Sequence, residues 1–160
     1  MKKIIAIAAA LIMAATAFAQ DGRSIYQKYS DYDGVSGVFI SPAMFRMMGR
    51  LPDMEIDDSE VNLSSIIKSL SGMYIINSEN PELIPSLKKD ADKLITKGGY
   101  ELMMEAKDNG ETVRIFTAGT EEIVTSFVLL TYERDGCTFI CLDGQMPREQ
   151  LEGAIAKAQR

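Results

Sequence analysis

The chain has 160 residues, with 17 basic and 23 acidic side chains, no histidine and a formal net charge of −6. This acidic balance disfavours nucleic acid and anionic lipid surfaces as partners. The lack of histidine excludes Ser-His-Asp and Cys-His catalysis, and it excludes zinc sites built with histidine. The composition therefore indicates a folded domain whose chemistry does not use an imidazole.

The N-terminus has the pattern of a secretory signal peptide. Two lysines precede an uncharged apolar run, and Ala17-Phe18-Ala19 supplies the small-x-small pattern of a cleavage site. The run has about a dozen residues, against roughly 20 needed to cross a bilayer, so we expect no membrane span. Gln20 follows where a lipoprotein needs cysteine. We expect a signal peptide over 1–19, a single domain over 20–160, and a periplasmic or secreted protein that is not a lipoprotein.

Apolar periodicity predicts helices and two short strands in the first half of the domain. The helices are expected over residues 23–32, 42–48, 60–71 and 79–97, and the strands over 35–40 and 73–77. Ser41-Pro42 supplies an N-cap and a first-turn proline for the second helix. Pro85 has to lie in the first turn of its helix, because a deeper proline would break the hydrogen-bond ladder.

From Tyr100 onward the apolar period changes to two, which is typical of strands. Asn109-Gly110 is a strong signal for a two-residue hairpin turn. This turn pairs Ala106 with Val113 and Met104 with Ile115, and it places Glu105 opposite Arg114. Because apolar side chains meet apolar ones and opposite charges meet, the predicted register is self-consistent.

A second hairpin and a final helix complete the pattern. Residues 123–132 are apolar on both faces, which indicates a central strand. Asp135-Gly136, taken as a two-residue turn, pairs Tyr132 with Phe139 and Leu130 with Cys141. A helix is expected over 147–158. We predict an α+β fold with a mostly antiparallel sheet, a C-terminal four-strand meander and helices packed on one face.

The two cysteines, Cys137 and Cys141, lie on one predicted strand. Four residues of extended chain separate their Cα atoms by roughly 13 Å, beyond the limit of about 7 Å for a disulfide. Their even spacing points both thiols to one face, with Phe139 between them. We therefore expect two free, buried thiols.

Four segments of the second half resemble domain of unknown function 4252. They are Tyr100-Glu101-Leu102-Met103-Met104, Asp108-Asn109-Gly110-Glu111, Val128-Leu129-Leu130 and Leu142-Asp143-Gly144. The resemblance extends from about residue 34 to the C-terminus. It implies a small secreted or lipid-anchored envelope protein, chiefly of Bacteroidetes, in a regulatory context. It brings no catalytic residues.

Methionine is the most unusual component of the sequence, with ten residues in all. Several of them gather around one short predicted helix and its exit. The candidate ligand- or partner-binding residues are Met44, Phe45, Met47, Met48 and Leu51. Met-rich surfaces adapt to protein partners, although methionine also fills irregular cores and, outside the cytoplasm, ligates Cu(I). Met44 and Met48 share a helix face with Leu51, which favours core packing, and among the functional alternatives we rank a protein-contact surface above a copper site.

No set of residues has the quality of a catalytic motif or a metal site. The acidic residues Asp53, Glu55 and Asp57 imitate the start of an EF-hand loop, but Asp58 stands at the glycine position and Ser64 at the bidentate glutamate position. We expect no catalytic residue, metal or cofactor. The sequence favours a non-enzymatic protein-binding or regulatory module with an envelope protein as partner. The alternatives are a periplasmic carrier of a small ligand, or an enzyme without a recognisable motif.

Overall fold

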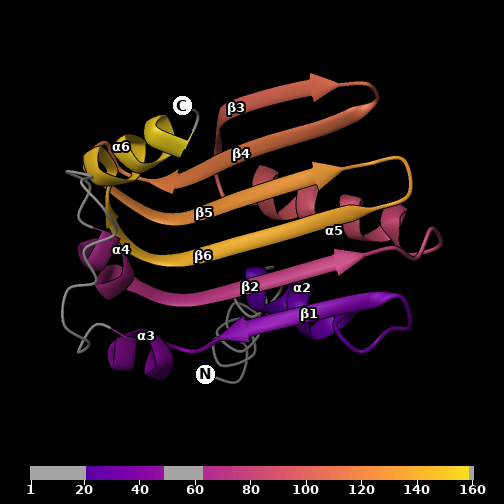
Figure 1. The fold of residues 1–160 in the computed structure, drawn as a ribbon, viewed down its shortest axis with the longest axis horizontal. Coiled ribbons are helices and arrows are strands. Elements are labelled where there is room, and N and C mark those ends of the chain that lie inside the picture. Colours follow the sequence, from indigo (N-terminus) through magenta and orange to yellow (C-terminus); the bar gives the residue numbers. More distant parts are fainter. Residues whose placement is uncertain (1–20, 49–62, 159–160) are drawn as a thin grey trace, which may run out of the picture.

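Figure 1 shows the computed structural model of the chain, which describes residues 21–48 and 63–158. The helices are α2 (Gly22–Tyr29), α3 (Pro42–Met48), α4 (Leu63–Ser69), α5 (Ile84–Lys97) and α6 (Arg148–Ala158). The strands are β1 (Val35–Ile40), β2 (Leu70–Ser78), β3 (Glu101–Asp108), β4 (Glu111–Gly119), β5 (Ile123–Tyr132) and β6 (Cys137–Pro147). No helix in these ranges is long and apolar enough to cross a membrane.

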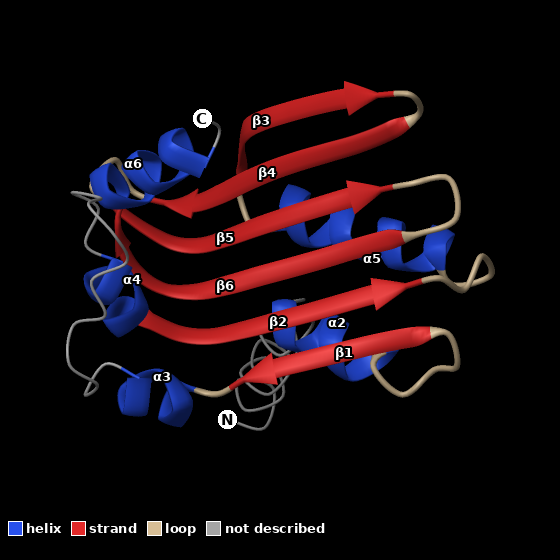
Figure 2. Cartoon of the chain, in the orientation of Figure 1, coloured by secondary structure: helices blue, strands red, loops and turns tan. Residues whose placement is uncertain are grey.

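The strands form one antiparallel sheet in the order β1-β2-β6-β5-β4-β3 (Figure 2). The run from β3 to β6 is a meander, and β1 and β2 extend it on the β6 side. The predicted α+β class, antiparallel sheet and C-terminal meander are confirmed. Within residues 21–48 and 63–158, β1 and β3 are the two edge strands, so each has a neighbouring strand on one side of its main chain only.

The two faces of the sheet are covered to different extents. α2 and α5 lie behind the sheet in Figure 1 and cover one face along much of its length. Their apolar side chains, including Ile25, Tyr29, Leu87 and Leu94, share a core with the inward side chains of β2, β4, β5 and β6. The prediction of helices on one face therefore holds for α2 and α5, whereas α4 and α6 pack on the opposite face at one end only, around a second, smaller core that includes Phe127.

The first predicted hairpin is confirmed in full. Ala106 pairs with Val113, Met104 with Ile115, and Glu105 with Arg114. The Glu105 Oε2 accepts a hydrogen bond of 2.6 Å from Arg114 Nε. Asn109 and Gly110 have φ values of 48° and 89°, as a type I′ turn requires.

The second predicted hairpin register is wrong by two residues. Tyr132 pairs with Cys137 and Leu130 with Phe139, because the turn has four residues rather than two. The amide of Glu133 donates to the Gly136 carbonyl across 2.9 Å and closes this longer turn. A shift of two keeps every side chain on its predicted face, so the core is unaffected.

Several predicted boundaries also move. The first helix ends at Tyr29 instead of residue 32, and β2 begins at Leu70, inside the helix predicted over 60–71. The helix predicted over 79–97 begins at Ile84, because the chain first makes a turn in which the Leu83 and Ile84 amides donate to the Asn80 carbonyl. Pro85 lies in the first turn, as predicted.

α2 and α5 are joined by a buried carboxylate. Asp90 of α5 accepts hydrogen bonds from Tyr29 Oη at 2.7 Å and from Lys28 Nζ at 2.5 Å, both from α2. Tyr29 is only 1% exposed. Burial, followed by the bond to Asp90, raises the pKa of the Tyr29 phenol to about 12. The pair fixes the two helices relative to each other behind the sheet.

Candidate functional site

The helix α3 distributes the predicted contact residues between the interior and the surface. Phe45 is 3% exposed, whereas Met44 and Met47 are 43% and 58% exposed. Met48 is half-buried, and Leu51 lies outside the described residues. Helical spacing alone could not decide which side of so short a helix faces the core.

Sequence reasoning did not include Phe39 of β1 among the contact residues. Its ring is 43% exposed, and it stacks on Tyr74 with a centroid separation of 5.1 Å and an interplanar angle of 12°. Tyr26 of α2 contacts the same ring at 6.0 Å. The signal that could have indicated Phe39 is the uncharged sequence of its strand, Val-Ser-Gly-Val-Phe-Ile, which is unusual at a sheet edge.

β1 and α3 follow one another along the same edge of the sheet (Figure 1). We call this the β1–α3 edge and define it by Phe39, Met44, Met47 and the outer main chain of β1. It combines exposed aromatic and methionine side chains with strand hydrogen-bonding groups that no strand of the described residues pairs. Such an edge can accept a further strand from another chain.

The residues closest to a catalytic cluster are polar groups of β5, β6 and Tyr100, which lies in the connection between α5 and β3. Tyr100 Oη donates to Ser126 Oγ at 2.8 Å, and Ser126 Oγ donates to Asp143 Oδ1 at 2.9 Å. The Cys141 thiol lies 3.6 Å from the same carboxylate oxygen. Gly22 at the start of α2 closes over this thiol, and a Cβ at Gly22 would lie 2.5 Å from Cys141 Sγ.

This cluster is not an activated nucleophile. Burial, then the neighbouring Asp143 charge, raises the pKa of the Cys141 thiol, so the thiol stays protonated at neutral pH. Burial likewise raises the pKa of Asp143. The Ser126 hydroxyl already donates a hydrogen bond to Asp143 and accepts a hydrogen bond from Tyr100. The arrangement satisfies buried polar atoms and holds the strands in register.

The cysteine prediction is confirmed. Cys137 and Cys141 are free and buried, and both belong to the core that also holds Phe139. Burial raises the pKa of the Cys137 thiol to about 12. Both thiols are therefore packing groups rather than reactive ones at neutral pH. In the part of the chain that the structure describes, no group of three or more carboxylate or thiol ligands is arranged to hold a metal ion.

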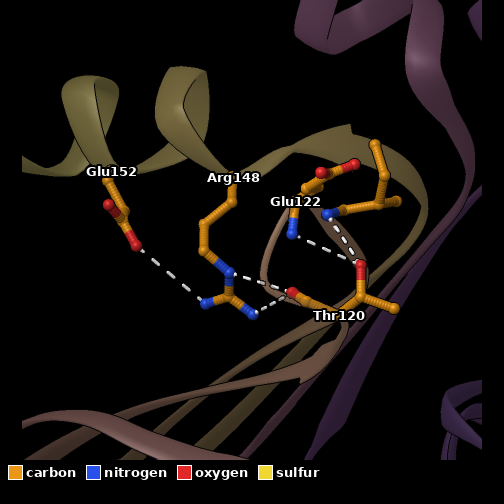
Figure 3. A network of polar contacts seen from close by, with 5 residues as sticks. Thr120, Glu122, Arg148 and Glu152 are labelled. Atoms are coloured by element: carbon orange, nitrogen blue, oxygen red, sulfur yellow. Dashed lines mark hydrogen bonds and ion pairs between the residues drawn. The ribbon is translucent and has the colours of Figure 1, made fainter.

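A second polar network fastens α6 to the turn between β4 and β5 (Figure 3). Arg148 Nε and Nη2 donate to the Thr120 carbonyl at 3.1 and 2.8 Å. The Thr120 hydroxyl accepts from the amides of Glu122 and Ile123. Arg148 Nη1 lies 4.0 Å from the Glu152 carboxylate. Each cation and carbonyl here has a partner within the fold, so the network is structural.

Comparison with known proteins identifies a family without assigning an activity. Neither a curated protein nor a solved structure matches the chain. A family model described as a domain of unknown function (DUF4252) matches residues 29–154, and the chain belongs to that family.

Proposed function

We propose that this protein is a secreted, non-enzymatic envelope protein that binds a partner protein through the β1–α3 edge. The observation that carries this proposal is the exposure of Phe39, Met44 and Met47 along one edge of the sheet, whose strand β1 is uncharged. Aromatic and methionine side chains are enriched in protein interfaces, and charged ones are depleted from interface centres. The flexible methionines fit a partner surface that is itself irregular.

The binding mode that suits this edge is strand addition. Natural edge strands usually carry a charge, a proline or a bulge that prevents pairing with another chain. β1 has none of these over its six residues, and its register with β2 is regular. A partner strand would gain main-chain hydrogen bonds from β1, while Phe39 and the α3 methionines contribute apolar contact.

The buried cluster supports a non-enzymatic role. Its thiol, hydroxyl and carboxylate are hydrogen-bonded to one another, and burial holds the pKa of the thiol above its ordinary range. A nucleophile requires a deprotonated or base-activated form in a partly exposed place. The described residues offer binding surface more readily than chemistry.

The test is site-specific photo-crosslinking in the native cell envelope. A photoreactive residue at position 47 should capture a discrete partner in stoichiometric yield, and the same residue at exposed Thr96 on α5 should not. Met47→Glu should abolish capture from a crosslinker placed at position 44. Equal capture from positions 47 and 96, or none from position 47, would reject the edge as the binding site. The mass of the purified protein tests secretion, because a processed chain begins at Gln20.

A further inference from the structure

The face of the sheet opposite α2 and α5 carries a continuous apolar row. Cross-strand pairing places one residue from each strand side by side across the whole sheet. We call this the central row; in spatial order it consists of Val38, Ile75, Ile140, Leu129, Ile115 and Met104. The helices α4 and α6 bury the Ile115 part of the row, but Val38 is 48% exposed and Ile75, Ile140 and Leu129 are only half-buried.

The next row toward the loops is also uncharged. In the same strand order it consists of Ser36, Asn77, Thr138, Thr131, Val113 and Ala106. Thr138 Oγ1 donates to Asn77 Oδ1 across the strands at 3.0 Å. None of these six residues is fully buried. We call the two rows together the open face, and it is uncharged from one edge strand to the other.

The loops beyond the open face form an acidic rim. The exposed carboxylates there are Asp31, Asp33, Glu79, Glu82, Glu133 and Asp135 in the loops and Asp108 and Glu111 at the adjoining strand ends, against the exposed cations Arg134 and Lys107. A surface hollow lined by Asn77, Glu79, Glu133, Asp135 and Gly136 joins this rim to the open face. The open face and the carboxylates of Glu79, Glu133 and Asp135 are therefore parts of one continuous surface.

We propose that the open face binds a cationic amphipathic helix of a partner protein. The face offers side chains only, because its main-chain groups are paired within the sheet, so an occupant has to satisfy its own backbone hydrogen bonds. A helix does so, whereas an isolated strand does not. The acidic rim selects lysine or arginine along one flank of that helix and repels nucleic acid and anionic lipid.

The dimensions of the face set the length of the occupant. Three strand spacings of about 4.8 Å separate Val38 from Leu129, so the accessible part of the central row is about 14 Å wide. A helix that covers this part needs at least about 10 residues at 1.5 Å per residue, and about 16 residues let an isolated peptide hold a helix in water. Its apolar stripe would cover Val38, Ile75, Ile140 and Leu129, and its basic flank would face Glu79, Glu133 and Asp135. This surface does not include Phe39, Met44 or Met47, so the inference stands apart from the β1–α3 edge.

The test uses the chain from Gln20 onward and two labelled helical peptides of about 16 residues. One peptide has leucine on one face and lysine on the other, and the second replaces every lysine with glutamate. Fluorescence anisotropy should show saturable, salt-sensitive binding of the Leu/Lys peptide and none of the Leu/Glu peptide. Equal binding of both peptides would overturn the proposal, because the acidic rim would then have no role.

Two sets of substitutions locate the binding. Ile75→Thr with Ile140→Thr should weaken the Leu/Lys peptide about tenfold or more, whereas Leu102→Thr, an exposed leucine on the other face of β3, should not. The exposed rim substitutions Glu79→Gln, Glu133→Gln and Asp135→Asn leave the core intact. They should weaken binding and flatten its salt dependence, unlike Glu101→Gln with Glu121→Gln at the opposite end of the strands.

Further outcomes separate this inference from its rivals. Met47→Glu should leave peptide affinity unchanged, so failure of the β1–α3 edge and failure of the open face are distinguishable. Analytical ultracentrifugation tests self-association of the open face. If the chain forms a dimer and the double variant Ile75→Thr with Ile140→Thr is a monomer, the occupant of the open face is a second copy of the chain. That result would overturn the proposal. Unchanged peptide affinity in both sets of variants would also reject it.

Discussion

Removal of the Asp90 carboxylate should destabilise the protein chiefly through Tyr29. In Asp90→Ala the Tyr29 hydroxyl keeps its buried position but loses its acceptor. A buried hydroxyl without a partner costs about 1–3 kcal/mol. Lys28 is about half-exposed and contributes little, because exposed ion pairs are worth about 0–1 kcal/mol. Alanine regains about 0.5 kcal/mol of helix propensity. We expect a net loss of about 2 kcal/mol.

Two further variants separate the contributions. Asp90→Asn keeps an acceptor for Tyr29 and should cost about half as much, because a neutral hydrogen bond is roughly half as strong as a charge-assisted one. Tyr29→Phe with Asp90→Ala removes donor and acceptor together. This double variant should be less destabilised than the sum of its single changes by about 1 kcal/mol.

Urea unfolding followed by circular dichroism measures these differences as shifts of the midpoint at constant m-value. A free energy of unfolding for Asp90→Ala within about 0.5 kcal/mol of the parent value would refute the reasoning, because an ordinary surface substitution changes stability by that much. Strict additivity of the double variant would also refute it, since the two groups would then not share an interaction.

Three other predictions follow from the fold. Burial raises the pKa of the Cys137 thiol from 9.0 to about 12, so the folded state retains a proton that the unfolded chain releases. The free energy of unfolding should therefore fall as pH rises above 9, and this thiol should contribute up to about 1.4 kcal/mol per pH unit. In urea unfolding, the stability of Cys137→Ala should fall less steeply with pH than that of the parent. An unchanged slope would contradict this assignment. Gly110→Ala should destabilise the protein by about 1–2 kcal/mol because Gly110 has a positive φ. Gly153→Ala, in the α6 helix, should stabilise the protein by about 0.5–1 kcal/mol. Changes of the same sign in the free energy of unfolding would show that backbone conformation does not govern these two positions. Arg148→Ala removes two hydrogen bonds to the Thr120 carbonyl and should cost about 1–2 kcal/mol in thermal unfolding, with faster amide exchange in α6 as the local signature; unchanged exchange would mean that other contacts hold the helix.

Local chemistry determined which parts of the fold could be predicted. Asn109-Gly110 fixes a hairpin because few residue pairs adopt its positive φ values, and the register follows from that turn. Asp135-Gly136 has the same appearance, yet the chain uses a four-residue turn there. A two-residue turn and a four-residue turn at this place put the same side chains on the same faces of the sheet. The alternation of apolar residues therefore could not distinguish the two turn lengths.

Long-range pairing explains the rest of what the sequence could not indicate. β2 lies beside β6, and this pairing is what places β1 at an edge and leaves Phe39 exposed. The alternation that predicts strands says which side chains share a face, but not whether a helix covers that face. The open face could therefore not be recognised before α2 and α5 were seen on the opposite side and α4 and α6 at one end.

The two proposed surfaces should reinforce one another because they meet at β1. A strand added beside β1 would place one side chain next to Val38 and extend the central row by about 4.8 Å. An apolar residue at that position would enlarge the area available to a helix on the open face. By linkage, the helix would then raise the affinity of the edge for its strand by the same factor. Titration of the Leu/Lys peptide with and without the partner captured at position 47 measures this coupling. Tighter peptide binding in the complex is expected, and competition between the two would show that one occupant uses both surfaces.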